Sequence, residues 1–185
     1  MSVTSPTKPV KLICGLISND KELIYQSVKI LSKKFGPIDL KSQVMSFDHT
    51  AYYQEEMGRD LKRQFLSFSR LIGPQHLPKV KLFTNRLERR FSVGSQRKRR
   101  INFDPGYISG SKLVLATGKN YRHRIYLGKG IYAEVTLYFA GGTFRPYEWT
   151  YPDYKTAGYI EFFNQTRRLY LTSPDDTSGR VKPRH

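Results

Sequence analysis

The chain has 185 residues, a formal net charge of +17 at pH 7, and an aromatic share of 14%. This length is enough for a domain with a buried core, and the single cysteine excludes an internal disulfide and a cysteine-cluster zinc site. No apolar run approaches the roughly 18 residues that cross a bilayer, and the N-terminus has no signal-peptide core, so we expect a cytoplasmic protein without membrane contact. The positive charge favours anionic partners, first of all RNA or nucleotide phosphate.

The first half of the chain alternates strand and helix patterns. Strands are predicted at 11–17, 43–47, 61–72 and 99–103. A helical stripe follows the first strand and ends at Gly36-Pro37, and Pro78 opens a second helix. This β-α-β-β-α-β order predicts a ferredoxin-like sandwich over 10–104.

The second half is organised around a β-hairpin. Apolar and polar residues alternate from Ile131 to Phe139, which indicates a strand with one face in a core. A three-residue loop, Gly128–Gly130, would pair Leu127 with Ile131 and Ile125 with Ala133, keeping the apolar face intact. The same register sets Tyr126 opposite Tyr132 and Arg124 opposite Glu134.

A C-terminal helix is predicted at about 155–171. The expected fold is therefore α+β, a ferredoxin-like βαββαβ sandwich extended by an antiparallel β-hairpin and a C-terminal helix. We expect a single domain over 10–171, between a flexible arm at 1–9 and a flexible tail at 172–185.

The polar face of the hairpin is the first candidate site. Glu134 beside Arg124 is a candidate general base, although the pair could equally be an ordinary ion pair on a sheet surface. His123 falls on the apolar side of the hairpin, which favours a packed histidine over a catalytic base. The residues considered as phosphate contacts are Arg124, Lys119, Lys112, Tyr126 and Tyr107.

Two acidic segments follow predicted strands. Asp104-Pro105-Gly106-Tyr107 is predicted to be a turn that presents Asp104 at a strand end. Asp48 begins a second cluster that includes Glu55 and Glu56. Carboxylates grouped in this way could bind Mg²⁺ or act as acid and base, or the cluster could be an acidic surface loop.

The segment from Arg86 to Arg100 contains seven basic residues and one acidic residue. Such a cluster could neutralise several nucleic-acid phosphates, and the alternative is a solvated helix face followed by a loop. The nucleic-acid contacts expected within it are Arg97, Lys98, Arg99 and Arg100. No RNA-binding motif, Walker loop, nucleophile elbow or zinc-protease motif is present.

Six segments carry a family resemblance: KLICGLI, FDHTAYYQEEMG, LPKVKLFTN, INFDPGYI, LVLATGKNYRHRIYLGKGIYAEVTL and WTYPDY. In this order and spacing they resemble a bacterial family catalogued as domain of unknown function 4416, over roughly residues 9–171. Members of that family are sometimes labelled GTP-binding, and the family has no established activity. The polar positions to which the resemblance points are Asp48, Thr50, Tyr52, Tyr53, Glu55, Met57, Gly58, Lys81, Asn85, Asp104, Gly106, Tyr107, Lys119, His123, Arg124, Tyr126, Glu134, Thr136, Tyr151, Asp153 and Tyr154.

Three hypotheses for function remain open. The first is an enzyme that acts on a phosphate-bearing substrate, a nucleotide or RNA; it predicts that Asp48, Glu55, Asp104, Arg124 and Glu134 meet in one pocket. The second is a non-catalytic RNA- or ribosome-associated module that uses the basic run. The third is an atypical GTP-binding protein without a Walker motif.

Overall fold

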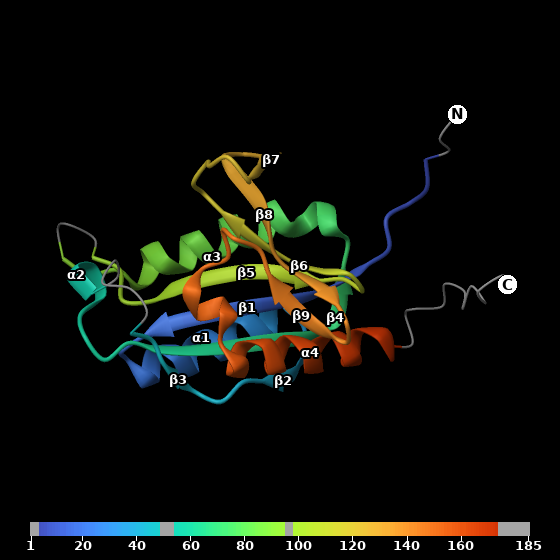
Figure 1. Cartoon of the computed structure of the whole chain (residues 1–185). Coiled ribbons are helices and arrows are strands. Elements are labelled where there is room, and N and C mark those ends of the chain that lie inside the picture. The colour runs from blue at the N-terminus through green and yellow to red at the C-terminus, as the bar shows by residue number, and fades with distance from the viewer. Residues whose placement is uncertain (1–3, 49–53, 95–97, 174–185) are drawn as a thin grey trace, which may run out of the picture.

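The computed structural model describes residues 4–48, 54–94 and 98–173, and combines one large antiparallel sheet with helices on both of its faces (Figure 1). The strands are β1 (Val10–Ser18), β2 (Ile38–Lys41), β3 (Met45–Ser46), β4 (Lys62–Ile72), β5 (Asn102–Ile108), β6 (Lys112–Thr117), β7 (Ile125–Gly128), β8 (Ile131–Ala140) and β9 (Thr143–Pro146). The helices are α1 (Lys21–Phe35), the short α2 (Gln54–Met57), α3 (Leu77–Phe91) and α4 (Ala157–Leu171), with 3₁₀ turns η2 (Pro74–His76) and η3 (Pro152–Lys155).

The sheet contains nine strands in the order β2-β4-β1-β5-β6-β8-β7, with β3 paired to β4 and β9 paired to β8. Each of these pairings is antiparallel. The central strand β1 is buried along its whole length, because β4 and β5 flank it and helices cover both faces. The predicted buried strand at 11–17 is therefore confirmed.

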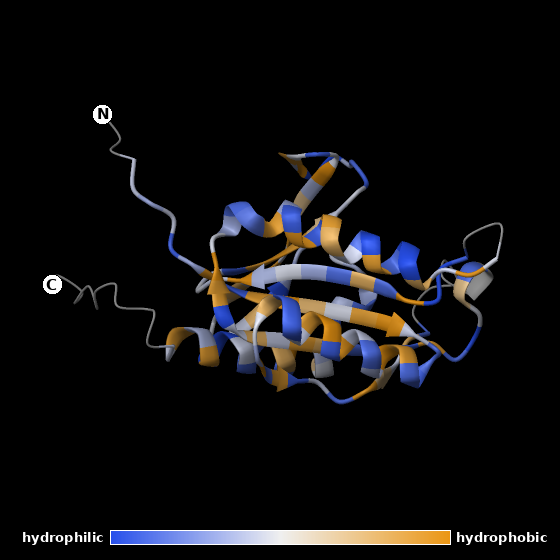
Figure 2. Cartoon of the chain, turned by 180° about the vertical axis from the view of Figure 1, so that it is seen from behind, coloured by the Kyte–Doolittle hydropathy of each residue, from blue (hydrophilic) through white to orange (hydrophobic). Residues whose placement is uncertain are grey.

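The core has two main layers, one on each face of the sheet. Leu12, Cys14 and Leu16 of β1 pack with α1 and α3, whereas Ile13 packs with α4. This is the alternation that a strand between two helical layers requires. Figure 2 shows the matching pattern on the helices, which carry bands of apolar and polar residues in turn.

The mixed fold with a large antiparallel sheet agrees with the prediction. The predicted strand over 61–72 corresponds to β4, and the predicted helix at 155–171 corresponds to α4. Among the described residues, no helix combines the length and apolar character needed to cross a membrane.

The strand predicted at 43–47 is wrong in position. The chain enters the sheet earlier, as β2 at 38–41, and only Met45 and Ser46 pair again, as β3. Within β2, Asp39 accepts hydrogen bonds from Lys11 of β1 and Ser67 of β4, so a carboxylate helps to attach this strand to the sheet, which an apolar pattern does not reveal.

The turn predicted at Asp104–Tyr107 is also wrong, because these residues lie inside β5. Pro105 is tolerated there because the pairing of β5 with β6 begins only at Gly106, so β1 alone is paired at the proline. A Cβ on Gly106 would lie 2.3 Å from the carbonyl oxygen of Val114. Glycine is therefore needed at this position because the two strands approach each other closely, and not because the chain turns there.

The predicted hairpin register is correct in part. Ile125 lies opposite Ala133 and Tyr126 opposite Tyr132, but a bulge places Gly128, not Leu127, opposite Ile131. The prediction that Ile125 faces the core is wrong: its exposed fraction is 69%, because β7 is the last strand of the sheet. Glu134 of β8 is buried instead, with an exposed fraction of 3%.

Candidate functional site

A cavity of about 820 Å³ lies where the two halves of the sheet separate. Strands β5 and β6 share only three residue pairs, from Gly106 opposite Leu115 to Ile108 opposite Leu113. Beyond Gly106, β5 continues along β1 and β6 continues along β8. The cavity walls come from both strands, from α3 and β8, and from the segment around η3.

The open edge of β5 is capped by side chains of α3. Lys81 Nζ donates to the carbonyl oxygen of Phe103 at 2.7 Å, and the N–H of Phe103 donates to Glu88 Oε1 at 2.8 Å. These two residues are seven positions apart and so share a face of the helix. They satisfy the backbone groups that a neighbouring strand would otherwise bind, and they also line the cavity.

The charged centre of the cavity is Arg63 on β4. Its guanidinium donates to Asp104 at 2.6 Å and to Asp153 at 3.1 Å. The same group lies over the rings of Phe47 and Phe65, 5.0 and 5.2 Å from their centroids. Its side chain is 3% exposed, so Arg63 holds the two carboxylates in place from below the cavity surface.

The protonation states of this centre follow from burial and from the charges of neighbouring groups. Burial alone would raise the pKa of Asp104, but the positive charges of Arg63 and Lys81 outweigh it and hold that pKa below its usual value. Burial raises the pKa of Glu88, and the charge of Lys81 opposes this only in part. Burial also raises the pKa of the Tyr154 hydroxyl, which keeps it neutral.

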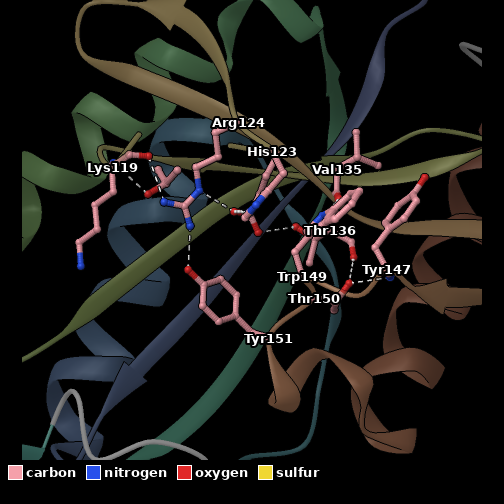
Figure 3. Close-up of polar contacts among 11 residues, drawn as sticks. Lys119, His123, Arg124, Val135, Thr136, Tyr147, Trp149, Thr150 and Tyr151 are labelled. Atoms are coloured by element: carbon pink, nitrogen blue, oxygen red, sulfur yellow. Dashed lines mark hydrogen bonds and ion pairs between the residues drawn. The ribbon is translucent and has the colours of Figure 1, made fainter. Parts of the chain in front are cut away.

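The hairpin contributes a second ion-pair network (Figure 3). Arg124 donates through Nε to Glu134 at 2.8 Å, through one terminal nitrogen to the carbonyl oxygen of Lys119 at 3.0 Å, and through the other to the hydroxyl of Tyr151 at 2.8 Å. His123 Nε2 lies 3.3 Å from Glu134 Oε2, the same oxygen that accepts from Arg124, and His123 is not among the residues that line the cavity. Arg124 thus ties the loop after β6 to the segment that leads into η3.

Trp149 and Thr150 extend these polar contacts along β8, although neither residue lines the cavity (Figure 3). The indole N–H of Trp149 donates to the carbonyl oxygen of Val135, and the Thr150 hydroxyl donates to that of Thr136. These bonds fill the gap along β8 between β7 and β9. The Trp149 ring also stacks on His123, with an interplanar angle of 12°.

The basic run after α3 is partly engaged inside the protein. Arg99 binds both oxygens of Glu56 and also donates to Asn102, and Arg100 donates to Asp20. Bonding to Arg99 lowers the pKa of Glu56. Lys98 pairs through its backbone with Val93, and Arg97 lies outside the described residues.

The structure brings some of the predicted site residues together and separates others. Asp104, Glu134, Arg124 and Lys119 all line the cavity. Asp48 is exposed and not among the lining residues, and the side chain of Glu55 lies outside the described part of the chain. The predicted convergence is thus observed for Asp104, Arg124 and Glu134.

The remaining predicted contacts lie elsewhere. Lys112 is at the opposite end of β6, paired with Tyr138. Tyr107 packs beside Leu77 and Val114 on the α3 side of the sheet, and Tyr126 is exposed on β7.

Sequence patterns alone missed much of the cavity. Arg63 and Glu88 line it and were not proposed as site residues, and Arg89, which also lines it, was considered only as part of the basic segment from Arg86 to Arg100. The family resemblance had pointed to other lining residues, namely Lys81, Asn85, Tyr151, Asp153 and Tyr154. No pattern marks Arg63, because its role depends on carboxylates 41 and 90 residues away in the chain.

The predicted Mg²⁺ site finds no support in the described ranges, which contain no group of three or more His, Cys, Asp or Glu side chains that could hold a metal ion. The carboxylates that do line the cavity have arginine or backbone partners: Asp104 and Asp153 bind Arg63, Glu134 binds Arg124, and Glu88 binds Phe103.

Comparison with known proteins identifies a family. The family model described as Domain of unknown function (DUF4416) matches residues 8–170. No curated protein and no solved structure matches the chain. Because the family match spans nearly all of the sequence, the protein belongs to the DUF4416 family.

Proposed function

We propose that the cavity between β5 and β6 binds a small phosphate-bearing ligand of about nucleotide size, and that the protein recognises or processes this ligand. The observation that carries the proposal is the set of cationic side chains that four separate segments bring to one cavity: Arg63, Lys81, Arg89, Arg99, Lys119 and Arg124. Ligand pockets in proteins commonly measure roughly 300–1,000 Å³, which includes the size of this cavity.

Several of these cations have donors left for a ligand. Lys81 has three N–H donors, and one of them is bound to Phe103. Arg124 has five, of which three are used in the network with Glu134, Lys119 and Tyr151. Arg89 is exposed on α3 and makes no side-chain bond within the described residues. These donors suit the oxygens of a phosphate.

The carboxylates suggest a division of roles. Asp104 and Glu134 are each held by an arginine, which favours roles in binding and positioning. Glu88 is the better candidate for proton transfer, because burial raises its pKa toward the physiological range and one oxygen remains after Phe103 binds the other.

We also propose that β1, α1, β2, β4, α3 and β5 form a ferredoxin-like half. The strand order β2-β4-β1-β5 and its antiparallel pairings support this interpretation, with β3 and α2 as additions between β2 and β4. The cavity would then lie at the outer edge of that half, where β6 and β8 extend the sheet.

The test is a calorimetric and thermal-shift titration of the full chain with nucleoside mono- and triphosphates at low salt. A ligand at a hundred times its dissociation constant should add about 2.7 kcal/mol of stability, and so raise the melting temperature by about 5–11 °C. Arg89→Ala should weaken binding roughly ten- to hundredfold, because it removes charged hydrogen bonds.

Arg90→Ala is the matched control, because Arg90 is the exposed neighbour on the same helix and does not line the cavity. Equal losses in Arg89→Ala and Arg90→Ala would point to general attraction by the positive charge and would contradict the proposed site. Binding of RNA oligonucleotides alone, fading steeply as salt rises, would favour the basic surface over the cavity.

A further inference from the structure

We infer that the ligand of this cavity carries N–H donors in addition to its phosphate, and that Asp104 accepts a hydrogen bond from them. This inference rests on the proposed function and narrows the ligand to one chemical class. That class is a phosphate ester joined to a part with amine or amide N–H groups, as in a nucleotide whose base carries an amino group.

The first step is the charge of the centre. One guanidinium, that of Arg63, is shared by two carboxylates, so the three side chains together have a formal charge of −1. Asp104 remains ionised there, because the charges of Arg63 and Lys81 outweigh the effect of burial. An ionised carboxylate only accepts hydrogen bonds.

The second step is access to the cavity. The Asp104 side chain is 24% exposed, whereas those of Asp153 and Arg63 are 7% and 3% exposed. Of these three groups, Asp104 is therefore the most accessible to a ligand in the cavity.

The third step is unused bonding capacity. Asp104 Oδ2 accepts from Arg63 at 2.6 Å and Oδ1 accepts from Asn102 at 3.0 Å. A carboxylate has about four acceptor positions, so about two remain for a ligand. An unprotonated phosphate oxygen cannot use them, because it has no hydrogen to donate and two anions repel each other. A ligand that fills the cavity must therefore place a donor at Asp104.

The surrounding wall suits a planar part of such a ligand. Phe47 and Tyr151 bring aromatic rings to the cavity, and Leu115 and Ala116 bring apolar surface from β6. Beyond Leu115, the edge of β6 that faces the opening has no partner residue in β5. Backbone donors and acceptors along such an edge can pair with the alternating N–H and carbonyl groups of a heterocycle.

The experiment compares ligands that differ in one feature. The series is inorganic phosphate, ribose 5-phosphate, AMP, and purine riboside 5′-monophosphate, which is AMP without its amino group; GMP and IMP form a second such pair. We expect wild-type protein to bind at least one amino nucleotide roughly ten- to hundredfold more tightly than its counterpart without the amino group, and more tightly than ribose 5-phosphate.

Asp104→Asn and Asp153→Asn provide the matched variants, because both weaken the bonding of Arg63 and only the first changes the exposed carboxylate. Asp104→Asn should reduce the preference for the amino nucleotide about tenfold or more, and should leave ribose 5-phosphate binding unchanged or stronger, because an anion is removed. Asp153→Asn should keep the preference.

The outcomes separate the two proposals. If nucleotides and ribose 5-phosphate bind wild-type protein equally, the inference fails and the phosphate site stands. If no phosphate-bearing compound binds, both fail. If Asp104→Asn weakens all ligands by the same factor as Asp153→Asn, Asp104 acts only through the fold and the inference is overturned. The wild-type ligand series decides the matter even if neither variant folds.

Discussion

Replacement of Arg63 by methionine should destabilise the protein strongly. Arg63 is 2% exposed and is the shared partner of Asp104 and Asp153, so its removal leaves two carboxylates close together without a cation. Breaking a buried ion pair from one side costs about 3–5 kcal/mol, a large part of the 5–15 kcal/mol that stabilises a typical protein. At about 2–4 °C per kcal/mol for a chain of this size, the melting temperature should fall by about 6–20 °C.

The loss should also depend on pH, with a definite sign. In the wild-type protein the pKa of Asp104 is lowered, so its contribution to stability is present above the unfolded-state pKa and is lost as pH falls through the folded-state pKa. In Arg63→Met, burial without the guanidinium penalises the charged carboxylates. The difference in unfolding free energy between variant and wild type should be largest near pH 7 and should shrink toward pH 4.

Urea denaturation at several pH values measures both effects. Arg100→Met is the control, because the Arg100–Asp20 pair is partly exposed, at 45% and 29%, and such pairs contribute about 0–1 kcal/mol. The triple variant Arg63→Met, Asp104→Asn, Asp153→Asn should recover part of the loss, because no uncompensated charge remains. A loss of the same size as in Arg100→Met, or one that is constant from pH 4 to pH 7, would refute this account of Arg63.

Three further predictions concern other parts of the structure. Glu88→Gln should change the free energy of unfolding in a pH-dependent way. The raised pKa of Glu88 stabilises the wild-type fold at low pH, and this contribution is lost as pH rises. In urea melts, the stability of the variant relative to wild type should therefore increase between pH 4 and pH 8. Gly106→Ala should cost more than about 2 kcal/mol in the same assay, because a Cβ would lie 2.3 Å from the Val114 oxygen, whereas Gly118→Ala, with open space around its Cβ, should change little. Ile125→Lys should stay within about 0.5 kcal/mol of wild type, because Ile125 is 69% exposed; a larger loss would mean that β7 packs against something more than the sheet.

Much of the fold follows from patterns within short segments. The apolar run at 11–17, the helical stripe that ends at Gly36 and the C-terminal helix are all determined by neighbours in the sequence, and the structure contains them. The hairpin register was partly predictable for the same reason. The bulge in this hairpin was not predicted. Gly128, Lys129 and Gly130 all have positive φ, and because Gly128 pairs with Ile131 the turn contains only two residues.

The site was harder to predict because burial of charge is not visible in a sequence. Glu134 alternates with apolar residues and so was expected on a polar face, yet it is 3% exposed because Arg124 compensates its charge. Asp104 was found for a wrong reason, as a turn residue at a strand end. Arg63 was missed, because its partners come from β5 and η3 and only the folded sheet brings them to β4.

Lys81 and Glu88 determine how far the sheet closes. While they bind the backbone of Phe103, β6 has no free donor or acceptor to pair with at that residue, and the strands remain apart. With apolar residues at both positions, the backbone groups of Phe103 would have to pair with water or with β6. Continued pairing with β6 would extend the hydrogen-bond ladder across the opening. The cavity therefore exists because two side chains of α3 take the place of a strand.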